Sequence, residues 1–114
     1  MATDTGELLQ GTLSILILKA LLAGPAHGYG VARWVEDATH DVLRIEEGSL
    51  YPALRRVEDR GWVTSEWGLS ENNRRAKYYT ITSAGRAHLR AEAVVWLRYA
   101  DAVTRVLRAA PSLA

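Results

Sequence analysis

The sequence predicts a mainly helical α+β fold in the order helix, helix, helix, strand, strand, long helix. Glycine and proline predict where helices stop, at Gly24-Pro25 and at Gly61. Apolar residues recur at helical spacing around these stops and again towards the C-terminus. Between about residues 63 and 81, polar and apolar residues alternate instead, which is typical of half-buried strands.

Composition indicates a small folded protein without cysteine chemistry. The chain has 114 residues, of which 48% are hydrophobic and none is cysteine, so disulfides and thiolate metal sites are excluded. No basic leader with a following apolar run opens the chain, and the most apolar segment, residues 8–23, contains Gln10 and Lys19 and is shorter than a membrane span. We therefore expect a cytoplasmic protein with no membrane partner.

The first two helices are expected to form the support of the domain. The first runs from about Glu7 to Ala23 and is apolar on most sides, so we expect it to be buried. His27 opens the second, and four of its apolar residues share one side: Tyr29, Ala32, Val35 and Ala38. Residues 39–44 form a connector, after which Ile45 is expected to point inward.

The third helix, about Gly48–Arg60, combines an apolar stripe with a basic outer face. The stripe follows the spacing i, i+4, i+7 and consists of Leu50, Leu54 and Val57. The opposite side carries Pro52, Arg55, Arg56 and Asp59, with Tyr51 on the flank. Pro52 is compatible with a helix only in the first turn, where backbone N–H groups have no helical partner. A helix with one anchored face and arginines on the other predicts a DNA-recognition helix.

Two strands and a final helix follow. Residues 68–75 are rich in turn formers and end in two arginines, so we expect a hairpin loop with a basic end. Tyr78 and Tyr79 should face opposite sides, one in the core and the other free to touch DNA or cap the last helix. Thr82-Ser83 can cap that helix, from about Ala84 to Ala109. This order predicts a winged helix-turn-helix domain at 1–83 and a dimerisation helix at 84–114.

Charge supports nucleic-acid binding only weakly. The net charge is +1, from 14 basic and 13 acidic residues, and 12 of the basic residues are arginine. Residues 1–45 carry −2, residues 46–82 carry 0 and residues 83–114 carry +3. Arginine suits phosphates and guanine edges, but abundant Arg and Ala can equally reflect genome composition.

Four blocks, in order and at the right spacing over about residues 8–89, resemble the PadR family of bacterial transcriptional regulators. They are Gly24–Tyr29, Gly48–Leu54, Val57-Glu58 with Gly61–Val63, and Arg75–Thr82 with Ala84-Gly85. The resemblance implies a homodimeric repressor in which each winged domain contacts a DNA half-site and the C-terminal helix forms the dimer, as in the short members. Gly30 departs from the family, which often has a larger or charged residue there.

The predicted DNA contacts lie on the third helix and on the hairpin. At the start of the helix, the hydroxyls and backbone N–H groups of Ser49 and Tyr51 are candidates to hold a phosphate. Pro52 is a candidate DNA contact beside them, although Tyr51 and Pro52 can also simply cap and stiffen the helix start. Arg55 is the candidate for reading bases, and Arg56 and Arg60 for phosphates or salt bridges. The predicted wing contacts, which an ordinary solvated charge run would also explain, are Arg74, Arg75 and Lys77.

The last helix carries an apolar seam at alternating spacings of three and four residues. The seam consists of Leu89, Ala93, Trp96, Ala100, Val103 and Leu107. We expect it to pair with another helix, most naturally the first helix of an opposite subunit, while Asp101 and Arg105 pair on the outer surface. Trp96 has two interpretations: it fills a dimer core, or it forms a platform for a flat effector, as the resemblance to drug-responsive short members implies.

The hypothesis is a cytoplasmic homodimeric repressor of double-stranded operator DNA, released by a small aromatic or apolar effector and needing no cofactor. Two alternatives keep the same fold. One is a metal-responsive regulator that uses Glu36, His40 and Asp41, and the other is an interaction module without operator specificity. No nucleophile–base set, phosphate-binding glycine loop or paired-carboxylate cleft stands out, so we do not expect an enzyme.

Overall fold

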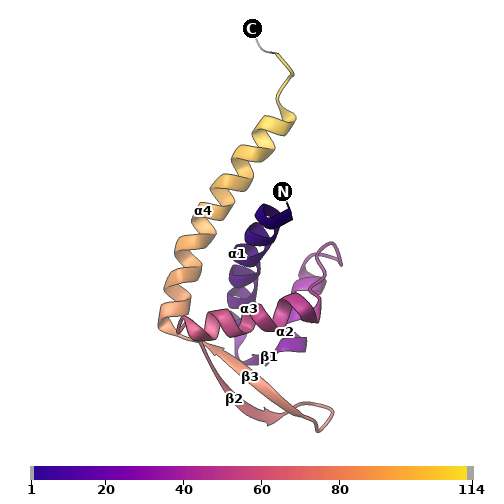
Figure 1. The fold of residues 1–114 in the computed structure, drawn as a ribbon, viewed down its shortest axis with the longest axis vertical. Helices are drawn as coiled ribbons and strands as arrows, with labels where there is room; N and C mark the ends of the chain where they lie inside the picture. Colours follow the sequence, from indigo (N-terminus) through magenta and orange to yellow (C-terminus); the bar gives the residue numbers. More distant parts are fainter. Residues whose placement is uncertain (1, 113–114) are drawn as a thin grey trace.

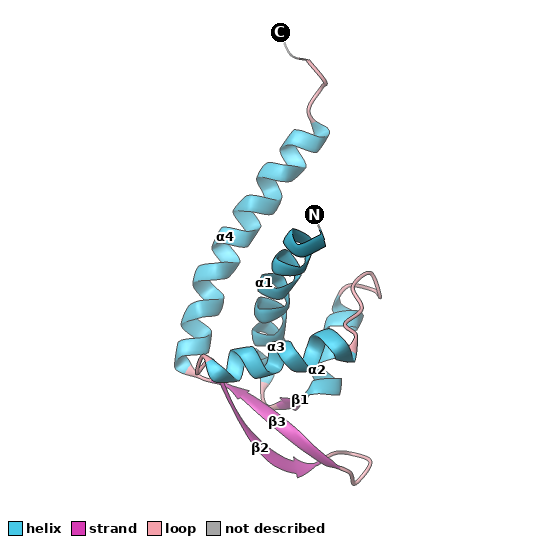
Figure 2. Cartoon of the chain, in the orientation of Figure 1, coloured by secondary structure: helices cyan, strands magenta, loops and turns pink. Residues whose placement is uncertain are grey.

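The computed structural model describes the backbone of residues 2–112 and the side chains of residues 11–112. The helices are α1 (Ala2–Ala20), a short 3₁₀ helix η1 (Leu21–Ala23), α2 (Gly28–Ala38), α3 (Glu47–Asp59) and α4 (Ser83–Arg108). The strands are β1 (Ala26–His27), β2 (Val63–Leu69) and β3 (Arg75–Ile81). This is the predicted α+β winged helix-turn-helix order, with helices above and a hairpin below them (Figures 1 and 2).

The sheet has one strand more than the sequence predicts. Its order is β1-β3-β2, and all pairs are antiparallel. The two-residue β1 pairs Ala26 with Tyr79 and His27 with Tyr78, whereas β2 pairs along its whole length with β3, from Val63 opposite Ile81 to Leu69 opposite Arg75. The edge strand β1 therefore fixes the start of α2 beside the wing, the hairpin of β2 and β3.

The core lies where α1, α2, α3 and the base of the sheet meet. Its largest fully buried side chains are Ile17, Leu18, Leu21, Val31, Val35, Leu50, Leu54, Val57 and Val63. The side chains of residues 8–10, which belong to the apolar segment predicted to be buried, lie outside the described ones. Within residues 2–112, no helix combines the length and the hydropathy needed to cross a bilayer.

The buried face of α2 differs from the predicted one. Its buried residues are Gly28, Val31, Ala32 and Val35, at the spacing i, i+3, i+4, i+7. Tyr29 and Ala38 are exposed, so only part of the predicted side faces the core. Gly28 occupies the first buried position but has no apolar side chain, so the apolar pattern did not mark it. The sequence therefore placed the start of the stripe one residue too late, at Tyr29.

Helix α3 buries its predicted stripe and ends where the sequence predicts. Leu50, Leu54 and Val57 are buried together with Ala53. At the end, the N–H of Gly61 donates to Glu58 O and that of Trp62 to Val57 O, with Gly61 at φ +75°, which is a Schellman motif.

The position of Pro52 differs from the prediction. The helix begins at Glu47, so Pro52 lies in its second turn and not in its first. Proline has no N–H to donate to the carbonyl of Gly48 four residues earlier. Gly48 is exposed, so water can reach this carbonyl, and the helix tolerates the proline there.

Helix α4 starts in the core and leaves it. Thr82 caps it, its Oγ1 accepting a hydrogen bond from Gly85 N at 3.0 Å, as predicted. Gly85 and Leu89 are buried, and Trp96 reaches Thr12 of α1, but the later part of the helix extends beyond the other elements (Figure 1). The chain measures 63 × 28 × 27 Å, and its radius of gyration of 16.3 Å exceeds the roughly 13 Å typical of a compact domain of this length. Much of α4 therefore has no partner among the residues that the structure describes.

Candidate nucleic-acid interface

The outer face of α3 presents the residues that were predicted to contact DNA. Ser49, Tyr51, Pro52 and Arg55 are exposed, and Arg56 is half-buried. The hydroxyl and the backbone N–H of Ser49 were both predicted to hold a phosphate. The N–H already donates to Glu46 O at 3.0 Å, so the hydroxyl is the more available of the two. The buried stripe on the opposite side fixes how this face is turned, and it leaves Arg55 free to reach outward.

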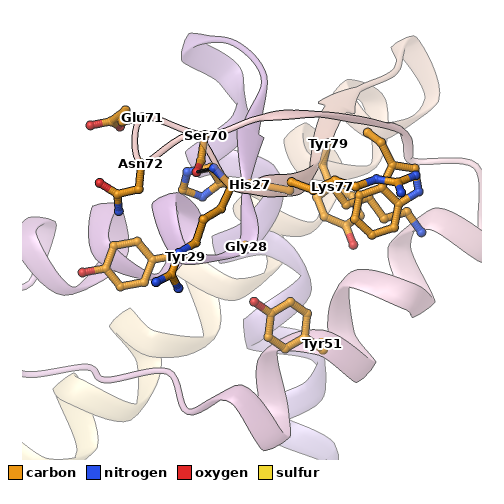
Figure 3. A pocket seen from close by; sticks show the side chains of 13 residues that line it. His27, Gly28, Tyr29, Tyr51, Ser70, Glu71, Asn72, Lys77 and Tyr79 are labelled. Carbon is orange, nitrogen blue, oxygen red and sulfur yellow. Dashed lines mark hydrogen bonds between the residues drawn. The ribbon is translucent and has the colours of Figure 1, made fainter.

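A groove with a volume of about 660 Å³ separates the first turn of α2 and Tyr51 of α3 from the wing. Figure 3 shows side chains from all three elements around it, with Tyr29 and Tyr51 on the helical side and Lys77 and Tyr79 on the strand. Three of the wing residues along it are cationic: Arg74, Arg75 and Lys77. The groove thus brings together predicted contacts from the recognition helix and from the wing.

Gly28 determines where Tyr51 lies. A β-carbon at Gly28 would come within 3.1 Å of Cε1 of Tyr51 and 3.2 Å of Cδ1 of Leu54. The absence of a side chain at this position lets the ring of Tyr51 pack against the first turn of α2. The tyrosine is thereby held at the groove while about half of its surface stays exposed.

The first turn of α2 adds a tyrosine to the groove, a position that the sequence did not predict for it. Tyr29 lines it, and the hydroxyl of Tyr29 accepts a hydrogen bond from Nη1 of Arg33 at 3.1 Å. This hydrogen bond raises the pKa of the exposed Arg33 guanidinium, and the nearby phenol raises it further. The cue was present in the i, i+4 spacing of Tyr29 and Arg33 on an exposed helix face.

The cations of the wing have different surroundings. Nζ of Lys77 lies 3.5 Å from Oε1 of Glu58 on α3, and Ser65 Oγ donates to the other oxygen of that carboxylate. Arg74 and Arg75 are exposed, and Cζ of Arg75 lies 4.7 Å from the ring centre of Trp67. Lys77 therefore links the wing to α3, whereas the two arginines extend towards solvent.

Tyr78 and Tyr79 face opposite sides, as expected, but neither takes the free role predicted for one of them. Tyr79 is buried, and this burial raises the pKa of its hydroxyl, with Glu58 and Tyr51 raising it further. Tyr78 donates its hydroxyl to Leu69 O at 2.9 Å, and its ring packs edge-on against His27. Tyr78 thus braces the hairpin against β1, a strand that the sequence did not predict.

The seam of α4 passes from the core into solvent. Leu89 is 8% exposed, Trp96 is 42% exposed and Leu107 is 78% exposed. Nε1 of Trp96 donates to Oγ1 of Thr12 at 3.3 Å, so within the chain the seam first packs on α1 of the same subunit. Asp101 and Arg105 form the expected pair, with 3.4 Å between Oδ2 and Nε.

These features match a known family. The model of the PadR-like family of transcriptional regulators matches residues 17–91, from α1 through the wing to the first part of α4. The chain belongs to the PadR-like family. PadR-like proteins regulate transcription and are not enzymes.

Individual PadR-like structures agree with this fold. A PadR family regulator from Eggerthella lenta is 33% identical with a TM-score of 0.73, and the match covers 96% of this chain and 93% of that one. A transcriptional regulator from Clostridium thermocellum is 26% identical with a TM-score of 0.77, covering 87% and 96%.

PadR of Bacillus subtilis, a negative transcriptional regulator, is a longer relative. It is 25% identical over 77 residues, which are 68% of this chain and 42% of PadR. Its crystal structure in complex with operator DNA has a TM-score of 0.63 at 24% identity, covering 75% of this chain and 46% of that one. The chain therefore spans less than half the length of this relative.

The structure does not require glycine at position 30, where the chain departs from the PadR pattern. The N–H of Gly30 donates to Nδ1 of His27 at 3.0 Å, so His27 caps α2 with its side chain. A β-carbon at Gly30 would lie 3.4 Å from the His27 ring, which is ordinary contact. The cap needs the N–H at this position and not the absence of a side chain.

The structure does not assemble the alternative metal site. Glu36 Oε2 accepts from the N–H of Ile45 at 3.4 Å, and His40 and Asp41 lie in the left-handed turn after α2, at φ +51° and +64°. In the part of the chain that the structure describes, no three His, Cys, Asp or Glu side chains are placed to hold a metal ion. The turn that ends α2 separates residues that a continuous helix would have placed on one face.

Proposed function

We propose that this PadR-like protein is a cytoplasmic homodimeric repressor that binds a pseudopalindromic operator. The observation that carries the proposal is the open groove between α3 and the wing, with cationic side chains along it and exposed arginines at its rim. In winged helix-turn-helix domains, the equivalent helix lies in the major groove while the wing follows the backbone. The groove is therefore assigned to duplex DNA.

The outer face of α3 supports this assignment. Arg55 is exposed opposite the buried stripe and can present its guanidinium fork to a guanine edge. Arg74 and Arg75 lie where the wing would meet the phosphates, which give affinity without sequence information. The description of B. subtilis PadR as a negative regulator, and its structure with operator DNA, support a repressor of the same kind here.

The uncovered part of α4 supports a dimer. Large apolar side chains are exposed along it: Val94, Val95, Trp96, Leu97, Tyr99, Val103, Val106 and Leu107. A contiguous apolar patch of this kind is typical of a protein interface. A second copy, packed on this helix and on α1, would cover it and set the two recognition helices at a fixed distance. Two-fold symmetry then places the half-sites about 34–36 Å apart.

An effector site at the dimer axis follows from Trp96. Its indole is partly exposed on the seam and is held at one edge by Thr12, between the small residues Ala93 and Ala100. Two such rings facing each other would form a platform for a flat, apolar molecule. In this proposal residues 84–114 carry dimerisation and effector binding, and residues 1–83 carry DNA binding.

Sequencing the genomic DNA that the purified protein enriches, followed by affinity measurements at several salt concentrations, tests this function. We expect one palindromic motif, binding that weakens steeply as salt rises, and lower transcription from a promoter that carries the motif. A protein that binds no DNA at any salt concentration overturns the proposal and leaves an interaction module. A DNA affinity that changes with added divalent metal supports the metal-responsive alternative instead.

A further inference from the structure

Trp67 and Arg75 are diagonal neighbours on the face of the hairpin that is turned towards α3. In the strand register, Trp67 pairs with Lys77 and Leu69 pairs with Arg75, so all four side chains share that face. The guanidinium of Arg75 bends towards the indole, and its Cζ lies 4.7 Å from the ring centre. This distance is within the range of a cation–π contact, about 6 Å.

The neighbouring cation, Lys77, is held by a carboxylate and not by an aromatic ring alone. Lys77 forms a salt bridge with Glu58, so much of its charge is already compensated on the protein. Among residues 11–112, the salt bridges join Lys77 to Glu58 and Arg105 to Asp101, and none includes Arg75. Of these two cations facing α3, Arg75 is the one whose charge is not compensated by a carboxylate of the described residues.

An aromatic face holds a guanidinium without using the groups that bind phosphate. The indole contacts the flat side of the guanidinium, whereas the N–H donors point outward in its plane. The charge also stays at +1, because tryptophan carries none. The contact thus restricts a long, mobile side chain while its fork remains available to two oxygens of a phosphate.

Trp67 is not part of the hydrophobic core. Its side chain is 58% exposed, and the core members on the same strand pair end at Val63, Tyr79 and Ile81. It lines the groove opposite Tyr51 and beside Arg75. A large aromatic side chain left exposed next to an uncompensated cation, along a groove, indicates a role in binding and not in folding.

We propose that Trp67 is a positioning residue that holds the guanidinium of Arg75 ready for a backbone phosphate of duplex DNA. The inference rests on the proposed function and assigns different roles to the two cations. Arg75 contacts the phosphate, while Lys77 fixes the wing to α3 through Glu58. Trp67 contributes to affinity only through Arg75.

A double-mutant cycle on the 114-residue chain tests this. The DNA is the enriched operator fragment, and the variants are Trp67→Leu, Trp67→Phe, Arg75→Gln and the double variant Trp67→Leu/Arg75→Gln. We expect Trp67→Leu to weaken operator binding about two- to fivefold for each wing, which is the range of an exposed cation–π contact. Phenylalanine keeps an aromatic face, so Trp67→Phe should recover most of this loss. In the Arg75→Gln background, Trp67→Leu should cause no further loss.

A second measurement uses the free protein and separates positioning from a general loss of structure. In nuclear magnetic resonance spectra, the side-chain protons of Arg75 should show a ring-current shift that disappears in Trp67→Leu and persists in Trp67→Phe. Both variants should unfold at the same temperature as the wild type, because Trp67 is outside the core. Independent, multiplicative losses in the double variant, or a Trp67→Phe protein as weak as Trp67→Leu, overturn the inference.

The outcomes also separate this inference from the function on which it rests. If the wild type binds no DNA, the proposed function fails and the phosphate role of the pair fails with it. If the wild type binds its operator and Arg75→Gln weakens that binding, but Trp67→Leu has no effect, only the positioning role is lost. If Lys77→Gln weakens binding and lowers its salt dependence as much as Arg75→Gln does, the division of roles between the two cations is wrong.

Discussion

The imidazole of His88 lies flat on the indole of Trp62, with ring centres 3.6 Å apart and planes inclined by 13°. Trp62 is the first residue after the glycine that ends α3, and His88 belongs to the second turn of α4. On the side of α3, Cζ of Arg60 also lies 5.3 Å from the same indole ring. The stack therefore joins the segment that follows α3, the proposed recognition helix, directly to the start of α4, the helix proposed to form the dimer.

Removing this stack should loosen the junction between α3 and α4. We expect His88→Ala to lower the free energy of unfolding by about 1 kcal/mol, the usual value for an aromatic pair. Urea denaturation at a fixed protein concentration measures it. The control is Arg90→Ala, an exposed position on the same helix, which should leave the midpoint nearly unchanged. Equal midpoints for His88→Ala and Arg90→Ala would show that the stack adds nothing to stability.

Gly85 is the glycine whose replacement should damage the fold most. A β-carbon there would come within 2.1 Å of the carbonyl oxygen of Trp62, which also accepts the N–H of Thr82. A backbone atom cannot move aside as the end of a side chain can, so Gly85→Ala should cost about 3 kcal/mol or more. Gly48→Ala is the matched control, because no heavy atom lies within 4 Å of its β-carbon position. A Gly85→Ala protein that melts with the Gly48→Ala protein contradicts this close approach.

Tyr79 should make the protein sensitive to alkali. Burial raises the pKa of its hydroxyl above the ordinary 10.0, so the folded state disfavours the tyrosinate. Its contribution to stability is complete below pH 10 and is lost as the pH rises through the folded-state pKa. We expect the stability of the wild type to fall more steeply above pH 10 than that of Tyr79→Phe. Chemical denaturation of both proteins across this range decides it, and parallel curves would argue against the raised pKa.

Arg55 should determine which sequences are bound. Because it is the exposed arginine opposite the buried stripe of α3, Arg55→Ala should lower the preference for operator over scrambled DNA by about 1–3 kcal/mol. Fluorescence anisotropy with both DNAs measures this preference. Arg74→Ala, on the wing, serves as the comparison and should weaken binding to both DNAs alike. An unchanged operator preference in Arg55→Ala removes this residue from base readout.

Val103 should be central to the dimer. Val103→Asp places an unpaired charge in the seam, and we expect the protein to sediment as a monomer and to lose most of its operator affinity. Arg98→Asp introduces the same side chain about 140° away around the helix, outside the seam, so it should remain dimeric. Identical sedimentation of Val103→Asp and wild type would mean that the dimer interface lies elsewhere.

The predictable parts of the fold are those governed by local signals. The stripe of Leu50, Leu54 and Val57, the stop at Gly61 and the cap at Thr82 each depend on residues within a turn of one another, and all three are confirmed. Strand β1 escaped prediction because two residues carry no alternation, and only pairing with β3 makes Ala26 and His27 a strand. The exposure of Tyr29 was not predicted, because the buried stripe of α2 includes a glycine.

The candidate site also has a part that local sequence signals predict and a part that depends on how the strands pair. The basic wing and the outer face of α3 could be predicted as sets of residues, since charge and helical spacing are visible in the sequence. The contacts between side chains on opposite strands of the hairpin could not be predicted, because they depend on the register of β2 and β3. The sequence indicated Lys77 as one of three equivalent cations, whereas its salt bridge with Glu58 and the contact of Arg75 with Trp67 emerge only once β2 and β3 are aligned.

The close approach of Gly85 to the carbonyl of Trp62 fixes the start of α4, so that the rest of the helix can only turn about this point. At 1.5 Å per residue, the helix extends about 35 Å from Gly85 to its end at Arg108, and Trp96 lies about 17 Å from Gly85. A sideways displacement of about 1 Å at Trp96 then turns the helix by about 3°. Because Trp62 directly follows the glycine that ends α3, we expect this rotation to reach α3 and, in the proposed dimer, to act on both half-sites at once. In the proposed dimer, a small displacement between the two α4 helices would therefore change the distance between the two α3 helices on the DNA.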